Sequence, residues 1–210
     1  MNVMGEMKFY FLWLAGIMIV VFILQSMIPG FTEMFVLNDA VYSGQVWRYV
    51  SAVFLHGGIV HLLYNLFALL LFGMILEKLV GSRRFLAVFF VSGIVANVIA
   101  VNFYSSSLGA SGAIYGILGM IAIVRPFMMV WAFGLIMPMF IAVILWIAGD
   151  FLRIMSLIDP GNTGSIAHLS GVVVGILFGL FLGPERVNKK KRFDIPEEYV
   201  ESWEKRYMKG

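Results

Sequence analysis

The sequence lacks cysteine altogether and has few charged residues. Without cysteine, the chain can form neither disulfides nor thiolate metal sites, and it carries no thiol for catalysis. Charged residues make up only 13% of its 210 residues and hydrophobic residues 61%, whereas soluble domains are about one quarter charged and about half apolar. These deficits exclude a soluble globular domain and indicate an integral membrane protein built around a single domain.

Histidine is also scarce, and the three present are His56, His61 and His168. A cleavable signal peptide is not evident either. The first apolar run, about residues 9–28, is too long for the apolar region of a signal sequence and lacks a small-residue cleavage pattern. We therefore expect this run to be the first membrane span.

Six apolar segments can be recognised along the chain. They cover about residues 9–28, 59–80, 85–103, 111–125, 131–149 and 166–182. The predicted fold is an all-α membrane protein, in which a six-transmembrane-helix bundle occupies residues 1–184. A charged cytoplasmic tail occupies residues 185–210, and the acidic residues around Pro196 favour the start of a short helix there.

The distribution of basic residues predicts the topology. With the N-terminus in the cytoplasm, thirteen lysines and arginines fall on the inner side and only Arg48 and Arg153 on the outer side. Both termini are therefore predicted to be cytoplasmic. The connection 29–56 then lies outside, and because it is half apolar we expect it to fold against the bilayer surface. Trp47 and Arg48 are predicted to anchor it at the lipid interface.

The fourth apolar segment is too short to cross the hydrocarbon. It begins near Ser111 and ends at Arg125-Pro126, because proline disfavours helical geometry in the residue before it. At about 1.5 Å per residue it reaches roughly 21 Å, against about 30 Å of hydrocarbon. Its N-terminus is therefore predicted to lie within the membrane, beside protein or a water-filled cavity. A helix N-terminus offers free N–H groups to a developing oxyanion.

Four polar side chains are predicted to lie at a similar depth. Counted from the charged inner ends of their helices, Ser111 and His168 are roughly 21 and 25 Å away. Asn65 and His61 are roughly 18 and 24 Å from the inner end of theirs. Residues four apart share a helix face, so His61 lies with Asn65 and Ser111 with Tyr115. Polar residues inside a membrane are costly, which makes these side chains candidates for function.

Two of the helices carry a face made of glycines. The residues are Gly112, Gly116 and Gly119 in the fourth segment and Gly171, Gly175 and Gly179 in the sixth. Such faces let membrane helices approach closely. The small residues around Ser111 fit either a helix-packing patch or the surroundings of a nucleophile. Since His168 shares the glycine face of the sixth segment, close approach would bring its ring to Ser111, which favours a Ser-His pair.

Several separated motifs resemble those of the rhomboid family of intramembrane serine proteases. They are Trp47-Arg48, His56, His61-x-x-x-Asn65, Glu77, Gly109-Ala110-Ser111-Gly112 with Tyr115, and Ala167-His168-Leu169-Ser170-Gly171 continuing to Gly175. The resemblance covers the six-helix core, about residues 9–183. The ordered set is far more specific than any one of its motifs.

The resemblance implies a role for each of these residues. Ser111 would be the nucleophile and His168 the general base. His61 and Asn65, together with Ser111, would hold the oxyanion, and Tyr115 would support the base ring. The glycines Gly109, Gly112, Gly171 and Gly175 would support the site. No metal ligand is implied.

No carboxylate is expected beside His168. Asp150 and Asp159 fall in the predicted outer loop between the fifth and sixth segments, so a Ser-His dyad is favoured over a triad. Stacking of Tyr115 on the imidazole would then fix the ring. His56 is expected to be structural.

The leading function is a serine endopeptidase of the cell membrane, a multi-pass protein that cleaves transmembrane segments of other membrane proteins. Its predicted partners are substrates with a helix-weakened transmembrane segment and the lipid bilayer, with no cofactor and no nucleic acid. One alternative is a proteolytically inactive relative that binds membrane clients. Another is a small-solute transporter, which the absence of an inverted repeat and of a mid-membrane acid disfavours.

Overall fold

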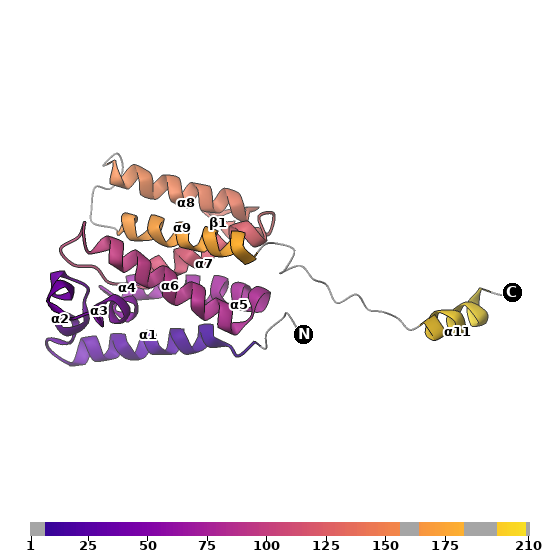
Figure 1. The fold of residues 1–210 in the computed structure, drawn as a ribbon, viewed down its shortest axis with the longest axis horizontal. Coiled ribbons are helices and arrows are strands. Elements are labelled where there is room, and N and C mark those ends of the chain that lie inside the picture. Colours follow the sequence, from indigo (N-terminus) through magenta and orange to yellow (C-terminus); the bar gives the residue numbers. More distant parts are fainter. Residues whose placement is uncertain (1–6, 156–163, 183–196, 209–210) are drawn as a thin grey trace.

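The computed structural model describes residues 7–155, 164–182 and 197–208, and Figure 1 shows the long helices between residues 10 and 182 running side by side in one bundle. The elements that build the bundle are α1 (Tyr10–Met27), α4 (Ile59–Ala68), the π-helical turn η3 (Leu69–Gly73), α5 (Met74–Val80), α6 (Ser82–Ala100), α7 (Ser111–Val124), α8 (Met139–Ile154) and α9 (Ser165–Leu182). The remaining elements are α2 (Phe31–Phe35), η1 (Asp39–Ser43), α3 (Arg48–Ser51), η2 (Ala52–Phe54), β1 (Met129–Ala132), β2 (Leu135–Pro138) and α11 (Glu197–Tyr207).

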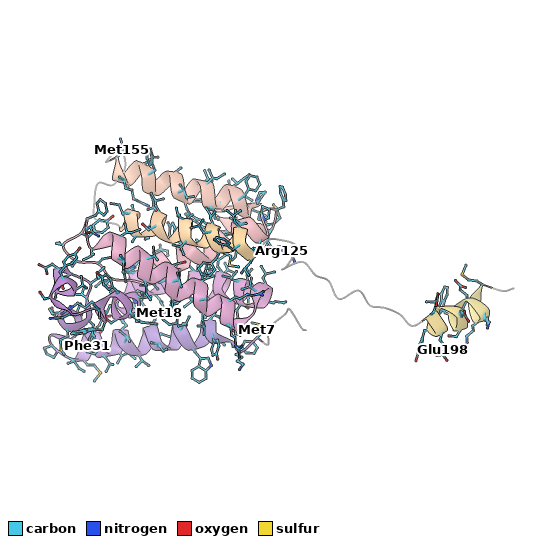
Figure 2. The ribbon with its side chains drawn as sticks, in the orientation of Figure 1. Met7, Met18, Phe31, Arg125, Met155 and Glu198 are labelled. Carbon is cyan, nitrogen blue, oxygen red and sulfur yellow. The ribbon has the colours of Figure 1, made fainter. Side chains whose placement is uncertain are left out.

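The helix α7 forms the centre of the bundle, with α1 and α8 on its opposite sides (Figure 1). Ten of the 14 residues of α7 are buried, as expected for a helix surrounded by others. Helices α6, α8 and α9 pack against it. Met18 of α1, labelled in Figure 2, is fully buried in the same core. Large apolar side chains on the outer faces of α1, α4 and α9 are exposed, as membrane helices require.

Most of the predicted spans coincide with helices within a few residues. In the described chain, four runs are long and apolar enough to cross a membrane: Tyr10–Met27, Ile59–Val80, Ser82–Ala100 and Ser165–Leu182. The second of these is continuous through the π-helical turn η3. The helix α7 has the predicted short length, and α11 confirms the short helix expected in the tail.

The fifth segment was predicted wrongly. Its first part, residues 131–138, is not helical but belongs to an antiparallel hairpin, residues 129–138, in which Ala132 pairs with Leu135. The two turn residues, Phe133 and Gly134, both have positive φ, 54° and 79°, as a type I′ hairpin turn demands. The helix α8 therefore begins only at Met139 and continues past the predicted end to Ile154. The expectation of an all-α fold is wrong for this hairpin.

The connection between α1 and α4 is folded, but not in the way expected. Arg48 is only 6% exposed, so its side chain cannot anchor the connection in lipid, whereas Trp47 is 50% exposed. Nη1 of Arg48 donates to the carbonyls of Glu33 and Val36 at 2.8 and 2.7 Å, and its Nε donates to Gln45. The arginine thus holds the connection together from inside, by satisfying carbonyls that no helix pairs.

A buried carboxylate of α5 binds the start of α1. This contact lies at the end of the bundle that is opposite to the connection between α1 and α4. Glu77 is fully buried and accepts hydrogen bonds from the backbone N–H groups of Lys8, Tyr10 and Phe11. The hydroxyl of Ser82 donates to the same carboxylate at 2.6 Å. The free amides of a helix N-terminus need such an acceptor, which explains why this acid is buried.

The glycine faces of α7 and α9 meet backbone to backbone. A Cβ added at Gly171 would overlap the carbonyl of Gly112, and one added at Gly175 would overlap the carbonyl of Gly116. Helix α6 covers the other side of Gly112, where an added Cβ would lie 2.6 Å from the Cβ of Ala96. The predicted close packing of the two helices is confirmed, and it determines how near their N-terminal residues can come.

Candidate active site

The close packing of α7 and α9 brings Ser111 to His168. Ser111 is the first residue of α7, and His168 lies in the first turn of α9, where its N–H donates to the carbonyl of Gly164. The Oγ of Ser111 lies 2.8 Å from Nε2 of His168. A hydroxyl at this distance from an imidazole nitrogen can pass its proton to the ring as it attacks a carbonyl carbon.

The aromatic ring of Tyr115 stacks on the imidazole of His168. The ring centroids are 4.3 Å apart and the planes differ by only 11°. Tyr115 lies one turn after Ser111 on the same face of α7, so one helix positions both the hydroxyl and the surface on which the imidazole rests. This is the stacking that the sequence predicts.

A carboxylate lies against the other nitrogen of the imidazole, contrary to the sequence-based prediction. Nδ1 of His168 is 3.2 and 3.1 Å from Oδ1 and Oδ2 of Asp150. The sequence predicts Asp150 to lie in an outer loop, but the residue belongs to the last turns of α8 and is fully buried. Asp159, the other acid considered, lies outside the described residues.

The signal that could have revealed this acid is the spacing of Asp150 and Arg153. They are three positions apart, as on one face of a continuing helix, and their side chains approach to 3.5 Å. The hydroxyl of Ser165, which was not among the predicted site residues, donates to Oδ1 of Asp150 at 2.9 Å. Ser165 opens α9 three residues before His168, so both contacts come from the same helical turn.

His61 and Asn65 are placed on the opposite wall of the site, in α4. The N–H of Gly57 donates to Nδ1 of His61 at 3.4 Å, so the neutral ring carries its proton on Nε2, which points toward Gly109. A Cβ added at Gly109 would lie 2.9 Å from that nitrogen, which is why only glycine fits there. The side chain of Asn65 donates one of its N–H groups to the carbonyl of His61, leaving a second for another acceptor.

His56 packs behind His61, with the two rings edge to face at a centroid separation of 5.2 Å. Its Nδ1 donates to the carbonyl of Phe54 at 3.2 Å. Within the described part of the chain, no hydrogen-bond partner reaches its buried Nε2. Burial, with a smaller contribution from His61, lowers the pKa of His56 to about 4, so this ring stays neutral at physiological pH.

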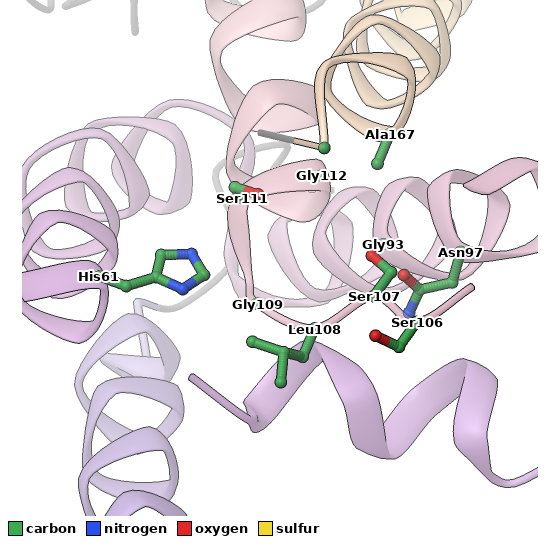
Figure 3. A pocket seen from close by; sticks show the side chains of 11 residues that line it. His61, Gly93, Asn97, Ser106, Ser107, Leu108, Gly109, Ser111, Gly112 and Ala167 are labelled. Carbon is green, nitrogen blue, oxygen red and sulfur yellow. The ribbon is translucent and has the colours of Figure 1, made fainter. Parts of the chain in front are cut away.

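Two cavities meet at Ser111. The first, of about 220 Å³, is lined by His61, Asn97, Ser111 and the loop 106–109. Figure 3 shows the ring of His61 and the hydroxyl of Ser111 facing this cavity from different helices. It has polar walls and room for several water molecules.

The second cavity, of about 430 Å³, is an apolar groove. Aromatic side chains from α4, η3, the hairpin and α8 line it, together with Ser111, Tyr115 and His168; the aromatic residues are Tyr64, Phe67, Phe72, Trp131, Phe133 and Trp146. The nucleophile thus lies between a polar cavity and an apolar groove.

Comparison with known proteins shows the family of this chain. The model of the rhomboid domain matches residues 43–185, more than half of the chain. The chain belongs to the rhomboid family. It is 34% identical over 158 residues to YdcA of Bacillus subtilis, a match that covers 74% of each protein. It is 28% identical over 182 residues to the rhomboid protease GlpG of Haemophilus influenzae, covering 83% of this chain and 91% of that one.

Membership in the rhomboid family makes this chain an integral membrane protein, in agreement with its apolar helices. It also supports a hydrolase of the protease class. Rhomboid proteases act on membrane-protein substrates within the bilayer.

Proposed function

We propose that this rhomboid is an intramembrane serine endopeptidase that cuts other membrane proteins within or near their transmembrane segments. The observation that carries the proposal is the 2.8 Å contact between Ser111 Oγ and His168 Nε2 at the junction of the two cavities. A protein that only binds clients needs no such contact. A transporter would need a path across the bundle, and the centre of the bundle is the packed helix α7.

The reaction follows from the positions of these atoms. The Oγ of Ser111 bonds to the carbonyl carbon of the scissile peptide while its proton passes to Nε2 of His168. The carbonyl oxygen then bears the negative charge, and the Nε2–H of His61, the amide of Asn65 and the N–H groups at the start of α7 are its donors.

The tetrahedral intermediate collapses as the C–N bond breaks, and His168 returns the proton to the leaving amine. Water then attacks the acyl-enzyme with His168 again as the base, which releases the new carboxyl group and regenerates Ser111. The polar cavity beside Ser111 is the source of this water.

The apolar groove is the proposed binding site for the substrate. Its aromatic walls suit a transmembrane segment, and the groove leads to Ser111 and His168. A substrate helix shields its peptide carbonyls by hydrogen bonding, so a segment with helix-weakening residues would present the scissile bond most readily.

The proposed topology places six helices across the membrane and both termini in the cytoplasm. The start of α1 and the end of α9 lie at the same end of the bundle (Figure 1), which supports this arrangement. The short helices of the connection lie at the other end, next to Ser111. The division into a membrane domain, residues 1–184, and a cytoplasmic tail, residues 185–210, is part of the same proposal.

The proposal is tested with purified protein in proteoliposomes that contain a reporter membrane protein with a glycine-rich transmembrane segment. Ser111→Ala and His168→Ala should each abolish cleavage and leave the melting temperature near that of the wild type, because the two groups act in one proton transfer. Substantial turnover by a folded Ser111→Ala protein would show that another group is the nucleophile.

A further inference from the structure

Asp150 is the one acid in the described part of α8, and its side chain is fully buried. Four groups surround its carboxylate: the imidazole of His168, the hydroxyl of Ser165, the guanidinium of Arg153 and the hydroxyl of Tyr115. Burying a carboxylate is costly unless its oxygens are paired with donors. The burial of Asp150 therefore costs desolvation energy at a position in α8 where an apolar side chain would be easier to accommodate.

An ion pair with Arg153 does not account for this burial. The guanidinium is 3.5 Å from Oδ1, and the Arg153 side chain is 37% exposed. Ion pairs with one partner in solvent contribute little to stability. The imidazole is closer, and its Nδ1 faces both carboxylate oxygens at 3.1 and 3.2 Å.

The orientation of the imidazole depends on which nitrogen carries the proton. A carboxylate oxygen can only accept, so its contact with Nδ1 requires Nδ1 to be the donor. In the neutral ring Nε2 then has a free lone pair, and Nε2 is the nitrogen that faces Ser111 at 2.8 Å. The stacked ring of Tyr115 restricts the imidazole plane, but stacking cannot choose between the two tautomers.

We propose that Asp150 is a positioning residue that makes the Ser111–His168 pair a triad. This inference rests on the proposed function. Asp150 holds His168 in the tautomer that can accept the Ser111 proton, and its negative charge stabilises the imidazolium that forms when the proton arrives. The proton stays on the imidazole, and Asp150 remains ionised throughout.

The decisive variant is Asp150→Asn, which keeps the size of the side chain and an oxygen for Ser165. Its NH₂ group would donate to Nδ1 and so move the imidazole proton to Nε2, the wrong tautomer for a base. We expect kcat to fall about 10³-fold. KM for the reporter substrate should change less than about twofold, because Asp150 does not line either cavity at Ser111.

A spectroscopic measurement distinguishes positioning from a structural role. In protein labelled with ¹⁵N-histidine, the His168 ring, assigned from the spectrum of His168→Gln, should be protonated on Nδ1 in the wild type and on Nε2 in Asp150→Asn. A carboxylate that merely fastened α8 to α9 would not move this signal in a folded variant. The wild-type spectrum alone overturns the proposal if it shows Nε2–H, even if Asp150→Asn does not fold.

Two neighbouring substitutions serve as matched controls. Arg153→Gln removes the half-exposed ion pair to the same carboxylate and should change kcat less than about threefold. Ser165→Ala removes a buried hydrogen bond to Asp150. Its main effect should be a lower melting temperature, and kcat should fall far less than in Asp150→Asn. If Ser165→Ala reduced kcat as severely as Asp150→Asn, the carboxylate would be a structural fastening and the proposal would be wrong.

Failure of this inference can be told apart from failure of the proposed function. Suppose that the wild type cleaves the reporter and Ser111→Ala does not, but Asp150→Asn cleaves at nearly the wild-type rate. The proposed protease activity is then supported, and the proposed role of Asp150 is wrong. If the wild type neither cleaves the reporter nor reacts with a fluorophosphonate at Ser111, the proposed function itself fails. A 10³-fold loss in Asp150→Asn together with the change of tautomer supports the triad.

Discussion

Two faces of α7 differ sharply, although both lead to the same serine. On one face, glycines of α7 and α9 place backbone against backbone, with no room for a single added carbon. On the other, an apolar groove of about 430 Å³ separates α7 from the aromatic side chains of α4, the hairpin and α8. In the proposed mechanism, the closed face holds Ser111 and His168 in position, and the open face leaves space for a substrate. A rigid site is thus combined with access from the side of the bundle.

The closed face should be the more sensitive to added volume. In Gly175→Val the new side chain would overlap the carbonyl of Gly116, so α9 must move away from α7 and carry His168 with it. We expect a loss of about 3 kcal/mol in the free energy of unfolding, the upper end for overpacking, and loss of proteolysis. Thermal unfolding in detergent and the reporter assay measure the two effects. Wild-type values for both would show that the helices do not need this approach.

The buried ring of His56, which packs behind His61, should resist protonation. Its folded-state pKa of about 4 is below the ordinary value of 6.5, so the unfolded chain binds the proton first as the pH falls. Stability present above pH 6.5 is therefore lost toward pH 4, by about 3 kcal/mol. His56→Gln should remove that part of the pH dependence, measured by denaturation at pH 7 and pH 4.5. If the free energy of unfolding changed with pH equally in the two proteins, His56 would not be shielded from solvent.

The open face should accept the same side chain that the closed face rejects. Ala68 of α4 lines the groove, and Ala68→Val narrows it without touching the glycine contacts. We expect KM for the membrane reporter to rise about tenfold, which corresponds to about 1.4 kcal/mol, while thermal stability stays near that of the wild type. Reaction of Ser111 with a small fluorophosphonate is the control and should be unchanged. If Ala68→Val lost as much thermal stability as Gly175→Val, the distinction between the two faces of α7 would be wrong.

The smallest effect is expected at the hairpin that borders the groove. Gly134 has a φ of 79°, and replacing it with alanine should cost about 1 kcal/mol of stability. The neighbouring ring of Phe133 lies 5.7 Å from that of Trp146, so loosening the turn should raise KM about twofold. Kinetics with the reporter and thermal unfolding measure both. An unchanged KM would show that the hairpin does not shape the groove.

The spans and the Ser-His approach could be predicted because each depends on a pattern that the membrane makes strict. Length and hydropathy define Tyr10–Met27 and Ser165–Leu182. Glycines spaced at helical intervals on α7 and α9 have few uses other than close packing, and the short length of α7 predicts that Ser111 lies below the membrane surface.

The hairpin and Asp150 could not be predicted, for a connected reason. The run from Trp131 onward is apolar, and short apolar runs do not distinguish a strand from a helix. As a helix that begins at Trp131, the run is predicted to end at Gly149, one residue before Asp150. Once the hairpin takes up residues 129–138, α8 shifts along the chain and carries Asp150 into the core.

Labelling with a fluorophosphonate tests the central claim most directly, because it depends only on the reactivity of Ser111 and needs no knowledge of the substrate. Mass spectrometry of the labelled wild-type protein should show one adduct per chain, on Ser111. His168→Ala should react at least about 10³-fold more slowly. An adduct at another residue, or equal labelling of the wild type and His168→Ala, would contradict the account of Ser111 as a nucleophile activated by His168.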